Sequence, residues 1–471
     1  MLCYEMRIVL IYPPFGNIEN QPNIKAVADN YGVFPPLSLA YVAGILQHAG
    51  HEVKLIDANA LHLSKLEVLK KVRDFNPDLL AFTVTTYLFY PVLEWINYLK
   101  ENTGLKALIG GVHMGLYPKE TLSHKEIDYA IIGEAEETLP KLIRALETRS
   151  SLKRVKGICY REGNKIIITP QRTLIKNLDK IPFPLRNQLP NEGYCSFVSH
   201  RKNFATMITA RGCPFKCIYC EQGNKSYRMR SAENVVDEIE ECYNKYNVRE
   251  IDFFDPEFTI NKKHVIDICK EIRKRGINIA WSCRSRVDTV DDEMLMEMSK
   301  AGCYRIYYGI ESGVESILKT LKKGTNLDVI KKNVALTKKN NIMTFGYFMV
   351  GCPGETKETI KKTVKFAKEL NLDYAQFSKL STLPGTELYE MLKPQLGYDY
   401  WQKFILNEKS RITLPRYRCS LSEEEIEEEI RKAYIQFYFR PVQLIKKISR
   451  TKSFDELRRD FKAAFSMVFS R

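Results

Sequence analysis

The sequence lacks any long apolar stretch. A membrane-spanning helix needs about 18 or more consecutive apolar residues, and no such run occurs among the 471 residues. Near the N-terminus, the apolar run that starts at Ile8 ends at Pro13 and Pro14, which is too short for the core of a secretory signal. We therefore expect a cytoplasmic protein without membrane spans.

Internal repeats and low-complexity tracts are also missing, and no basic motif is interleaved with aromatic residues. The lack of such a motif argues against nucleic-acid binding, although the formal net charge is +15. Lysine, isoleucine and asparagine are abundant throughout the chain, so the charge fits a compositional bias, with an anionic partner as the alternative. Basicity of this kind supports no inference about the fold.

Cysteine is not scarce, since the chain has 12 of them, but no export signal accompanies them. Cytosolic reductants keep thiols free, so a disulfide framework is not expected. The cysteines therefore indicate metal or redox chemistry, apart from those that serve as small apolar residues of the core.

Residues 1–150 alternate short apolar runs with amphipathic helical patterns. This alternation predicts an α/β domain of the doubly wound, Rossmann-like class with a parallel sheet. Such domains bind ligands beyond the carboxyl ends of their strands. The residues that the sequence places there are Pro14, Thr85, Gly110, Gly111, His113, Gly133 and Glu134. Glycine at a strand end lets a nucleotide-bearing ligand approach the backbone, or it simply closes a turn.

The rest of the chain divides into three parts. Residues 151–204 lose the alternation, which predicts a linker with a small β excursion. Residues 205–400 hold about six strand–helix units, which predict a partial (β/α)6 TIM-type barrel with its active site at the carboxyl ends of the strands. Residues 401–471 predict a basic helical segment with a capping box at Ser422 and Glu425. Its amphipathic end, residues 440–471, either packs against the barrel or makes peripheral contact with a membrane.

The most informative segment contains three cysteines, Cys213, Cys217 and Cys220, at CxxxCxxC spacing. Three thiolates on one loop can bind three irons of a 4Fe-4S cube and leave the fourth iron open. Structural zinc needs four closed ligands, and no second CxxC or nearby histidine pair supplies the fourth. We therefore predict an iron–sulfur cluster on this loop.

With Tyr219 before the last cysteine and a position directly after the first barrel strand, the motif resembles that of the radical S-adenosylmethionine (SAM) superfamily. The resemblance implies that SAM chelates the open iron and is cleaved reductively to a 5′-deoxyadenosyl radical. The residues that the resemblance assigns to SAM are Tyr219, Asp255, Ser282, Arg284, Glu311, Gly351, Pro353 and Leu383. Each of them alone has an ordinary reading as a turn glycine or a strand-end charge. Their order at the ends of successive strands favours the cofactor site.

The N-terminal region resembles the cobalamin-binding domain of one large subgroup of this superfamily, through segments 12–14, 34–41, 110–113 and 132–134. The resemblance implies that cobalamin binds at the strand-end residues named above. The motif Asp-x-His-x-x-Gly, in which a histidine ligates cobalt, is absent. The resemblance therefore implies a corrinoid without histidine ligation. His113 either approaches the corrinoid or forms hydrogen bonds within its turn.

The same resemblance implies an anaerobic methyl transfer to an unactivated carbon or to phosphorus, with one SAM as methyl source and a second as radical source. The alternatives are a non-methylating radical reaction, such as oxidative cyclisation, ring rearrangement or carbon–carbon coupling, and a non-catalytic corrinoid or iron–sulfur carrier. We expect a small-molecule or lipid substrate, a low-potential electron donor (flavodoxin or ferredoxin) and no nucleic-acid partner. Tyr307, Tyr308 and Tyr347 are candidates for handling the final proton.

Overall fold

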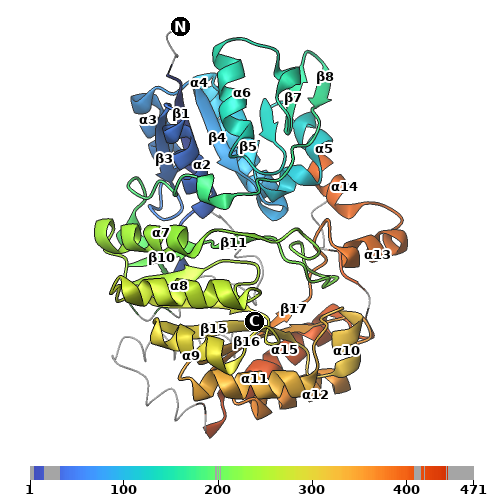
Figure 1. Cartoon of the computed structure of the whole chain (residues 1–471). Helices are drawn as coiled ribbons and strands as arrows, with labels where there is room; N and C mark the ends of the chain where they lie inside the picture. Colours follow the sequence, from blue (N-terminus) through green and yellow to red (C-terminus); the bar gives the residue numbers. More distant parts are fainter. Residues whose placement is uncertain are drawn as a thin grey trace. The chain divides into compact units, whose positions relative to one another are not determined.

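The computed structural model describes residues 5–14, 32–196, 199, 201, 203–407, 415–417, 419–441 and 443. These residues form two compact units (Figure 1). Unit 1 comprises the described residues in 5–14, 33–194 and 396–407, and unit 2 comprises residue 32, those in 195–395 and those from 415 onward. None of the helices in these ranges combines the length and the hydropathy of a membrane span.

Unit 1 is built on a seven-stranded sheet in the order β3-β1-β4-β5-β6-β7-β8. Its strands are β1 (Arg7–Tyr12), β3 (Glu52–Asp57), β4 (Leu79–Thr83), β5 (Lys106–Gly110), β6 (Tyr129–Ile131), β7 (Ile158–Glu162) and β8 (Lys165–Ile168). The first five pair in parallel, and β7 and β8 pair antiparallel. The strand order reverses between β1 and β4, as in flavodoxin-like doubly wound sheets. Sheets of this class bind their ligands beyond the strand ends at such a point.

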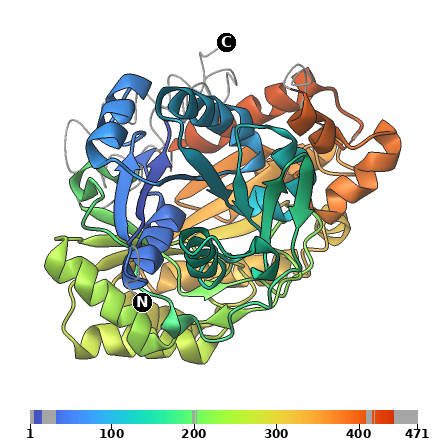
Figure 2. The same ribbon diagram turned by 90° about the horizontal axis from the view of Figure 1, so that it is seen from above.

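Helices follow the strands of unit 1 (Figure 2). They are α2 (Leu37–His48), α3 (Lys65–Phe75), α4 (Phe89–Thr103), α5 (Pro118–Ser123) and α6 (Thr138–Glu147), with 3-10 turns η2 (Thr86–Leu88), η3 (Val112–Gly115), η4 (Leu152–Arg154), η5 (Leu178–Lys180) and η6 (Asn191–Gly193). Residues 79–82 of β4 are all buried. Strands covered on both faces read as continuous apolar runs, and that is the pattern by which the sequence revealed them.

Helix α14 (Tyr400–Leu406) packs on unit 1 although it lies late in the chain. The hydroxyl of Tyr90 lies 2.7 Å from the carbonyl oxygen of Ile405, and Nε2 of His124 lies 2.7 Å from the same oxygen. Tyr117 donates a hydrogen bond to the carboxylate of Asp399. The chain therefore returns to its first unit after the barrel.

Unit 2 is built on a six-stranded parallel sheet in the order β10-β13-β14-β15-β16-β17. Its strands are β10 (Phe204–Met207), β13 (Glu250–Phe253), β14 (Ala280–Ser285), β15 (Cys303–Glu311), β16 (Met343–Val350) and β17 (Tyr374–Lys379). Its helices are α7 (Ala232–Lys245), α8 (Lys262–Lys274), α9 (Asp292–Lys300), α10 (Glu315–Thr320), α11 (Leu327–Lys339), α12 (Lys357–Glu369), α13 (Glu387–Leu396) and α15 (Glu423–Tyr438). The predicted partial (β/α)6 barrel is thus confirmed.

The two faces of this sheet differ in burial. Along β16, residues at even positions are buried and residues at odd positions are half-buried. Successive side chains of a strand point to opposite faces, so one face packs into the apolar core, which includes Phe348 and Val350. The other face carries Phe345 and Tyr347 in contact with one another, and Tyr307 stacks on Tyr347.

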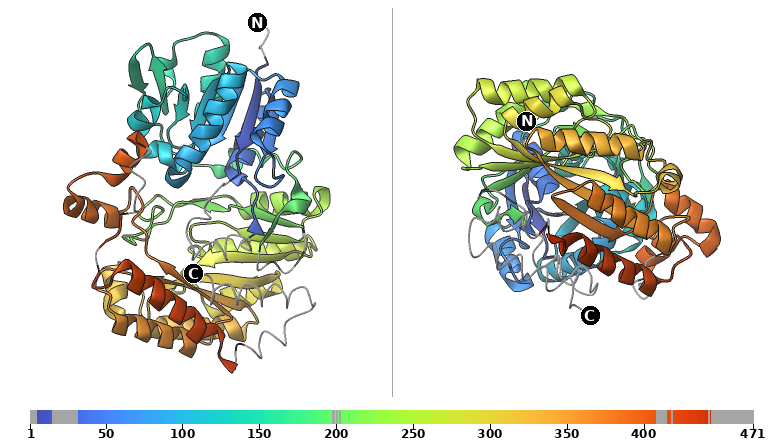
Figure 3. Two further views of the ribbon diagram at one scale, coloured as in Figure 1. Left: turned by 180° about the vertical axis from the view of Figure 1, so that it is seen from behind. Right: turned by 90° about the horizontal axis from the view of Figure 1, so that it is seen from below.

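Helix α15 covers the edge strand β17 (Figure 3). It begins at the predicted capping box, in which Ser422 and Glu425 bind each other's backbone N–H groups. The hydroxyls of Tyr434 and Tyr438 accept hydrogen bonds from the backbone N–H groups of Phe377 and Ala375. The helix thereby satisfies backbone groups that an open sheet edge would leave exposed.

The division into units differs from the expected boundaries. Residues 151–194, expected in a separate linker, belong to unit 1, because β7 and β8 extend its sheet. Residues 401–407, expected in the C-terminal segment, also belong to unit 1. Short strands β2 (Gly32–Val33) and β9 (Cys195–Ser196) lie where the chain passes between units. The basic segment 440–471 lies outside the described residues except for 440, 441 and 443.

Candidate functional site

The three cysteines lie on a loop between two short antiparallel strands, β11 (Ala210–Arg211) and β12 (Arg228–Met229). The loop begins at Gly212, whose φ is +81° and whose Cα approaches the carbonyl of Ser226 so closely that a Cβ would collide with it. Three backbone hydrogen bonds within the loop join residues 223–225 to carbonyl oxygens of earlier loop residues. These run from Lys225 to Cys213 (2.9 Å), from Asn224 to Phe215 (2.7 Å) and from Gly223 to Cys220 (3.2 Å).

The three thiols fit an iron–sulfur cube. Every cysteine in the described part of the chain is free, Cys213 is buried, and Cys217 and Cys220 are partly exposed. Among the described residues, no three histidine, cysteine or acidic side chains lie close enough to share one metal ion. A cube instead takes one thiolate per iron. Burial raises the pKa of the Cys213 and Cys220 thiols, so a bound cluster must stabilise their thiolate form.

Glu311, predicted to serve SAM, lies at the end of β15 with a left-handed φ of +69°. Its Oε1 accepts hydrogen bonds from the hydroxyl of Tyr219 at 2.8 Å and from Nζ of Lys323 at 2.9 Å. A Cβ at Gly309 would collide with this carboxylate and lie 2.9 Å from the lysine Nζ. The site therefore joins the cluster loop to β15 through one carboxylate oxygen, and Oε2 takes no part in these two bonds.

Asp255 has a different role from the expected binding of SAM. It is fully buried, and its carboxylate accepts bonds from the backbone N–H groups of Thr209 (2.7 Å) and Ala210 (2.6 Å). Burial raises its pKa to about 6. A carboxylate closed off in this way does not reach a ligand, so Asp255 supports the entry to the cluster loop instead of contacting SAM.

Ser282 is likewise enclosed. It is fully buried, and its hydroxyl donates to Oδ1 of Asp252 at 3.0 Å. Arg284 binds both carboxylate oxygens of Asp252, at 2.9 and 3.1 Å, and its guanidinium lies 4.0 Å from the ring centre of Phe254. Arg284 and Ser282 of β14 therefore both bind the carboxylate of Asp252, and the expected role of these two residues in binding SAM stays a prediction.

Three further expected SAM residues lie in the loops after β16 and β17. Gly351 and Pro353 are buried, and Leu383 is half-buried. Glu355 holds the first of these loops, because its Oε2 accepts the N–H groups of Gly351 (2.5 Å) and Cys352 (3.0 Å). Its Oε1 is buried without a hydrogen-bond partner, and burial raises the pKa of this carboxyl to about 7.

The expected cobalamin residues lie at the carboxyl ends of the strands in unit 1. Pro14, Thr85, Gly110, Gly111 and Gly133 are at least partly exposed there. Gly111 has a φ of +109°, and a Cβ on it would lie 2.5 Å from the carbonyl oxygen of Val84. Beside Gly110 and Gly133, a Cβ would meet open space. Such a rim fits a ligand that approaches the backbone closely.

Glu134 is half-buried, and its Oε2 accepts the backbone N–H of Ile175. The carboxylate thus secures the chain after β8. It is placed at the expected strand end, but one of its oxygens is bound within the protein.

His113 is enclosed within unit 1. It is fully buried, with Nε2 2.9 Å from the Thr121 hydroxyl and Nδ1 3.1 Å from the Thr86 hydroxyl. Thr121 donates its own proton to the Tyr117 carbonyl, so Nε2 carries the imidazole hydrogen and Nδ1 accepts from Thr86. Burial, with a smaller effect of His124, lowers the pKa of His113 to about 4. With both nitrogens occupied, His113 cannot ligate cobalt, which fits a corrinoid bound without histidine.

Sequence reasoning missed two cations beside the cluster loop, Lys323 and Arg286. Lys323 binds Glu311, and Nη1 of Arg286 lies 3.7 Å from Sγ of Cys217. Neither belongs to a motif that a single sequence exposes. Of the proposed tyrosines, Tyr308 is fully buried with its hydroxyl bonded to Thr337, so it is not a candidate for the final proton.

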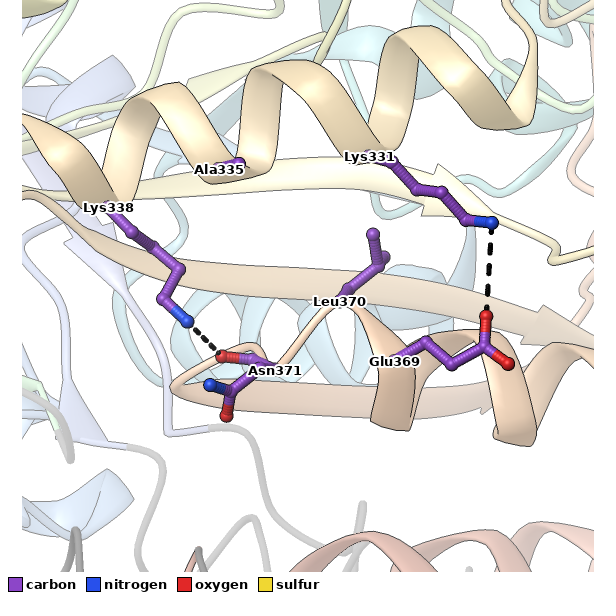
Figure 4. A pocket seen from close by; sticks show the side chains of 6 residues that line it. All are labelled: Lys331, Ala335, Lys338, Glu369, Leu370 and Asn371. Carbon is purple, nitrogen blue, oxygen red and sulfur yellow. Dashed lines mark hydrogen bonds and ion pairs between the residues drawn. The ribbon is translucent and has the colours of Figure 1, made fainter.

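A separate hollow of about 560 Å³ lies on the helical side of unit 2. It is lined by Lys331, Ala335, Lys338, Glu369, Leu370 and Asn371, with the ion pair between Lys331 and Glu369 and the bond from Lys338 to the Asn371 carbonyl drawn in Figure 4. Its residues precede β16 and β17. Barrel active sites occupy the opposite, carboxyl ends of the strands, so this hollow is not part of the candidate site.

Two family models match the chain, the radical SAM superfamily over residues 207–367 and the B12 binding domain over residues 25–143. An uncharacterized methyltransferase of Pyrococcus horikoshii is 35% identical over 450 residues, covering 94% of this chain and 95% of the relative. The anaerobic magnesium-protoporphyrin IX monomethyl ester cyclase of Rubrivivax gelatinosus is 30% identical over 410 residues, covering 85% of this chain and 72% of the cyclase. The solved structure of the radical SAM methyltransferase TsrM of Kitasatospora setae, with cobalamin and a 4Fe-4S cluster bound, aligns with a TM-score of 0.69 at 19% identity, over 83% of this chain and 78% of TsrM.

The barrel and its three-cysteine loop thus define a radical SAM enzyme. More particularly, the chain belongs to the group of the radical SAM superfamily that carries a B12-binding domain. Its cofactors are SAM, a 4Fe-4S cluster and cobalamin, as the sequence predicted.

Proposed function

We propose that this enzyme transfers a methyl group from SAM to an unactivated carbon or to phosphorus of a small-molecule or lipid substrate. The observation that carries the proposal is the likeness to a methyltransferase over nearly the full length of both chains. The cyclase relative matches over a smaller share of its own length. When bound, the cluster supplies the electron that cleaves SAM, and cobalamin supplies the methyl carrier.

The residues of the barrel would hold and orient SAM. Cys213, Cys217 and Cys220 would ligate three irons and leave the fourth for SAM. Glu311, tied to the loop by Tyr219, would contact SAM from the end of β15. The buried Glu355 fixes the loop at Gly351 by accepting two backbone bonds. Pre-organisation of this kind keeps the reacting bond in one geometry.

In unit 1, the open strand ends at Gly110, Gly111 and Gly133 would receive the corrinoid, without a histidine ligand from His113. Per turnover, a substrate carbon–hydrogen bond and two SAM molecules would give the methylated product, S-adenosylhomocysteine, methionine and 5′-deoxyadenosine. This balance consumes two electrons, which we assign to a low-potential one-electron donor such as flavodoxin or ferredoxin. The cytoplasmic location and the membrane contact of segment 440–471 stay predictions.

The test is an anaerobic incubation of the reconstituted enzyme with trideuteromethyl-labelled SAM, reduced methyl viologen and a small-molecule extract. A product in which one trideuteromethyl group replaces one hydrogen, formed with equal amounts of S-adenosylhomocysteine and 5′-deoxyadenosine, is the expected result. Formation of 5′-deoxyadenosine and a ring-closed product without label would instead establish the cyclase-like reaction. An enzyme with cluster and corrinoid loaded that yields no 5′-deoxyadenosine would be a carrier.

A further inference from the structure

Arg286 is a buried cation outside every motif considered so far. It follows β14 and is 5% exposed. A guanidinium is charged at all relevant pH values and offers five N–H donors. Burying such a group is costly unless its donors have partners, so its contacts show what it is built to hold.

One side of Arg286 contacts the cluster loop. Its guanidinium carbon lies 3.9 Å from the ring centre of Phe215, which is a close cation–π geometry. Its Nη1 lies 3.7 Å from Sγ of Cys217, within range of an N–H···S hydrogen bond. The same planar group therefore touches the ring that follows the first cysteine and the sulfur of the second.

The other side of Arg286 is anchored. Nε and Nη2 bind the two carboxylate oxygens of Asp288, at 2.9 and 2.7 Å, and Nη2 also donates to the carbonyl oxygen of Lys323. Its backbone N–H donates to Oε2 of Glu257 at 2.5 Å. These bonds leave the guanidinium no freedom to turn away from the loop. Asp288 binds the far edge, so the positive end of the pair faces the Cys217 sulfur.

We infer that Arg286 is a positioning residue that holds Cys217 for cluster binding and makes the bound cluster easier to reduce. Reduction adds one negative charge to the cluster. A hydrogen bond and a positive charge at a ligating sulfur stabilise the more negative form and so raise the reduction potential. The inference rests on the cluster and not on methyl transfer, because any radical SAM reaction begins with this reduction.

The decisive variant is Arg286→Met, which keeps the length of the side chain and removes its charge and donors. We expect the reconstituted variant to hold less iron and sulfide per chain. In an electron paramagnetic resonance titration, its ratio of reduced to oxidised cluster should fall about tenfold at a fixed potential, which is 59 mV for a one-electron couple. Arg275→Met is the matched control, since Arg275 pairs with Asp237 and Glu240 on the surface away from the loop. It should retain the wild-type potential.

Arg286→Lys separates charge from planar geometry and covers the case in which the methionine variant does not fold. It should fold, recover most of the potential and still bind less cluster, because an ammonium cannot stack on Phe215 and bind Asp288 at once. Wild-type iron content together with wild-type potential in the methionine variant would overturn the inference. If only the lysine variant folds, its equivalence to wild type in both readouts would do the same.

Discussion

Asp255 accepts two hydrogen bonds from Thr209, one from its backbone N–H at 2.7 Å and one from its hydroxyl at 2.8 Å. The segment after β13 thereby fixes the last residues before the cluster loop. Asp255→Ala removes the acceptor and leaves buried donors unsatisfied, at a cost of about 1–3 kcal/mol.

We expect Asp255→Ala to lose most of its iron after reconstitution and to unfold at lower temperature. Asp255→Asn should retain both properties far better. Its amide oxygen can take the place of Oδ1, and the Thr209 hydroxyl can reverse its bond. Iron assay and thermal unfolding measure the effect. Equal iron content in the alanine variant and wild type would contradict this account.

The thiols of the loop are separable from the other cysteines by mutation. Alanine at Cys213, Cys217 or Cys220 should each abolish the cluster absorbance and the formation of 5′-deoxyadenosine, because each removes one iron ligand. Cys195→Ala is the control, since Cys195 is exposed and free. Retention of the cluster in any one of the three loop variants would exclude that cysteine as a ligand.

Gly309 leaves the space that the Glu311 carboxylate and the Lys323 ammonium occupy. Gly309→Ala should displace this pair and weaken the binding of SAM by about tenfold, with little change in cluster content. Equilibrium binding of SAM to the reconstituted enzyme measures it. Gly193→Ala is the control, because its Cβ meets open space. Unchanged SAM affinity would show that the Glu311–Lys323 pair does not serve the cofactor.

Two features favour glycine at position 111, at the strand ends of unit 1. One is its left-handed backbone conformation, and the other is the close carbonyl oxygen of Val84. An alanine there has to adopt φ near +109° and to push on the Val84 carbonyl. Gly111→Ala should therefore retain several-fold less cobalamin, read from the visible spectrum after desalting. Gly50→Ala shares the positive φ but meets open space, so it isolates the backbone strain. If both variants retain equal corrinoid, Gly111 does not shape the site.

We expect the buried carboxyl of Glu355 to make the free energy of unfolding depend on pH. Burial raises the pKa of its carboxyl from 4.5 to about 7. A pKa raised by folding means that the stability contribution is fully present below pH 4.5 and is lost as the pH rises through about 7. Between pH 5 and pH 8, this group should lower the free energy of unfolding by roughly 2–3 kcal/mol.

Glu355→Gln should remove most of this dependence, because the amide oxygen can accept the same backbone bonds without a charge. Denaturant unfolding of the cluster-free protein at both pH values, for wild type and variant, measures the difference. An identical slope in the two proteins would assign the pH dependence to other groups.

Much of the architecture was readable from local sequence. Apolar runs alternating with helical periodicity predicted both sheets. In unit 1, residues 79–82 of β4 form one continuous apolar run because they are buried on both faces of the sheet. The CxxxCxxC spacing predicted the cluster, and the count of strand–helix units predicted the barrel. The capping box at Ser422 and Glu425 was also predicted, because its partners lie three residues apart.

What local sequence could not show is which distant residues meet. Asp255 and Ser282 looked like ligand-facing positions, yet the fold closes Asp255 on Thr209 and Ser282 on Asp252. His113 looked available to a corrinoid, but its neighbours Thr86 and Thr121 occupy both ring nitrogens. The return of residues 396–407 to unit 1 has no local signal either.

The class of chemistry could thus be predicted from local sequence, because three thiolates at fixed spacing form a site within one loop. The side chains that surround that loop depend on the fold. Lys323 and Arg286 reach it from other parts of the barrel, 104 and 69 residues from their partners Tyr219 and Cys217. Burial and hydrogen bonding over such separations depend on the packing of the whole sheet, which no local pattern contains.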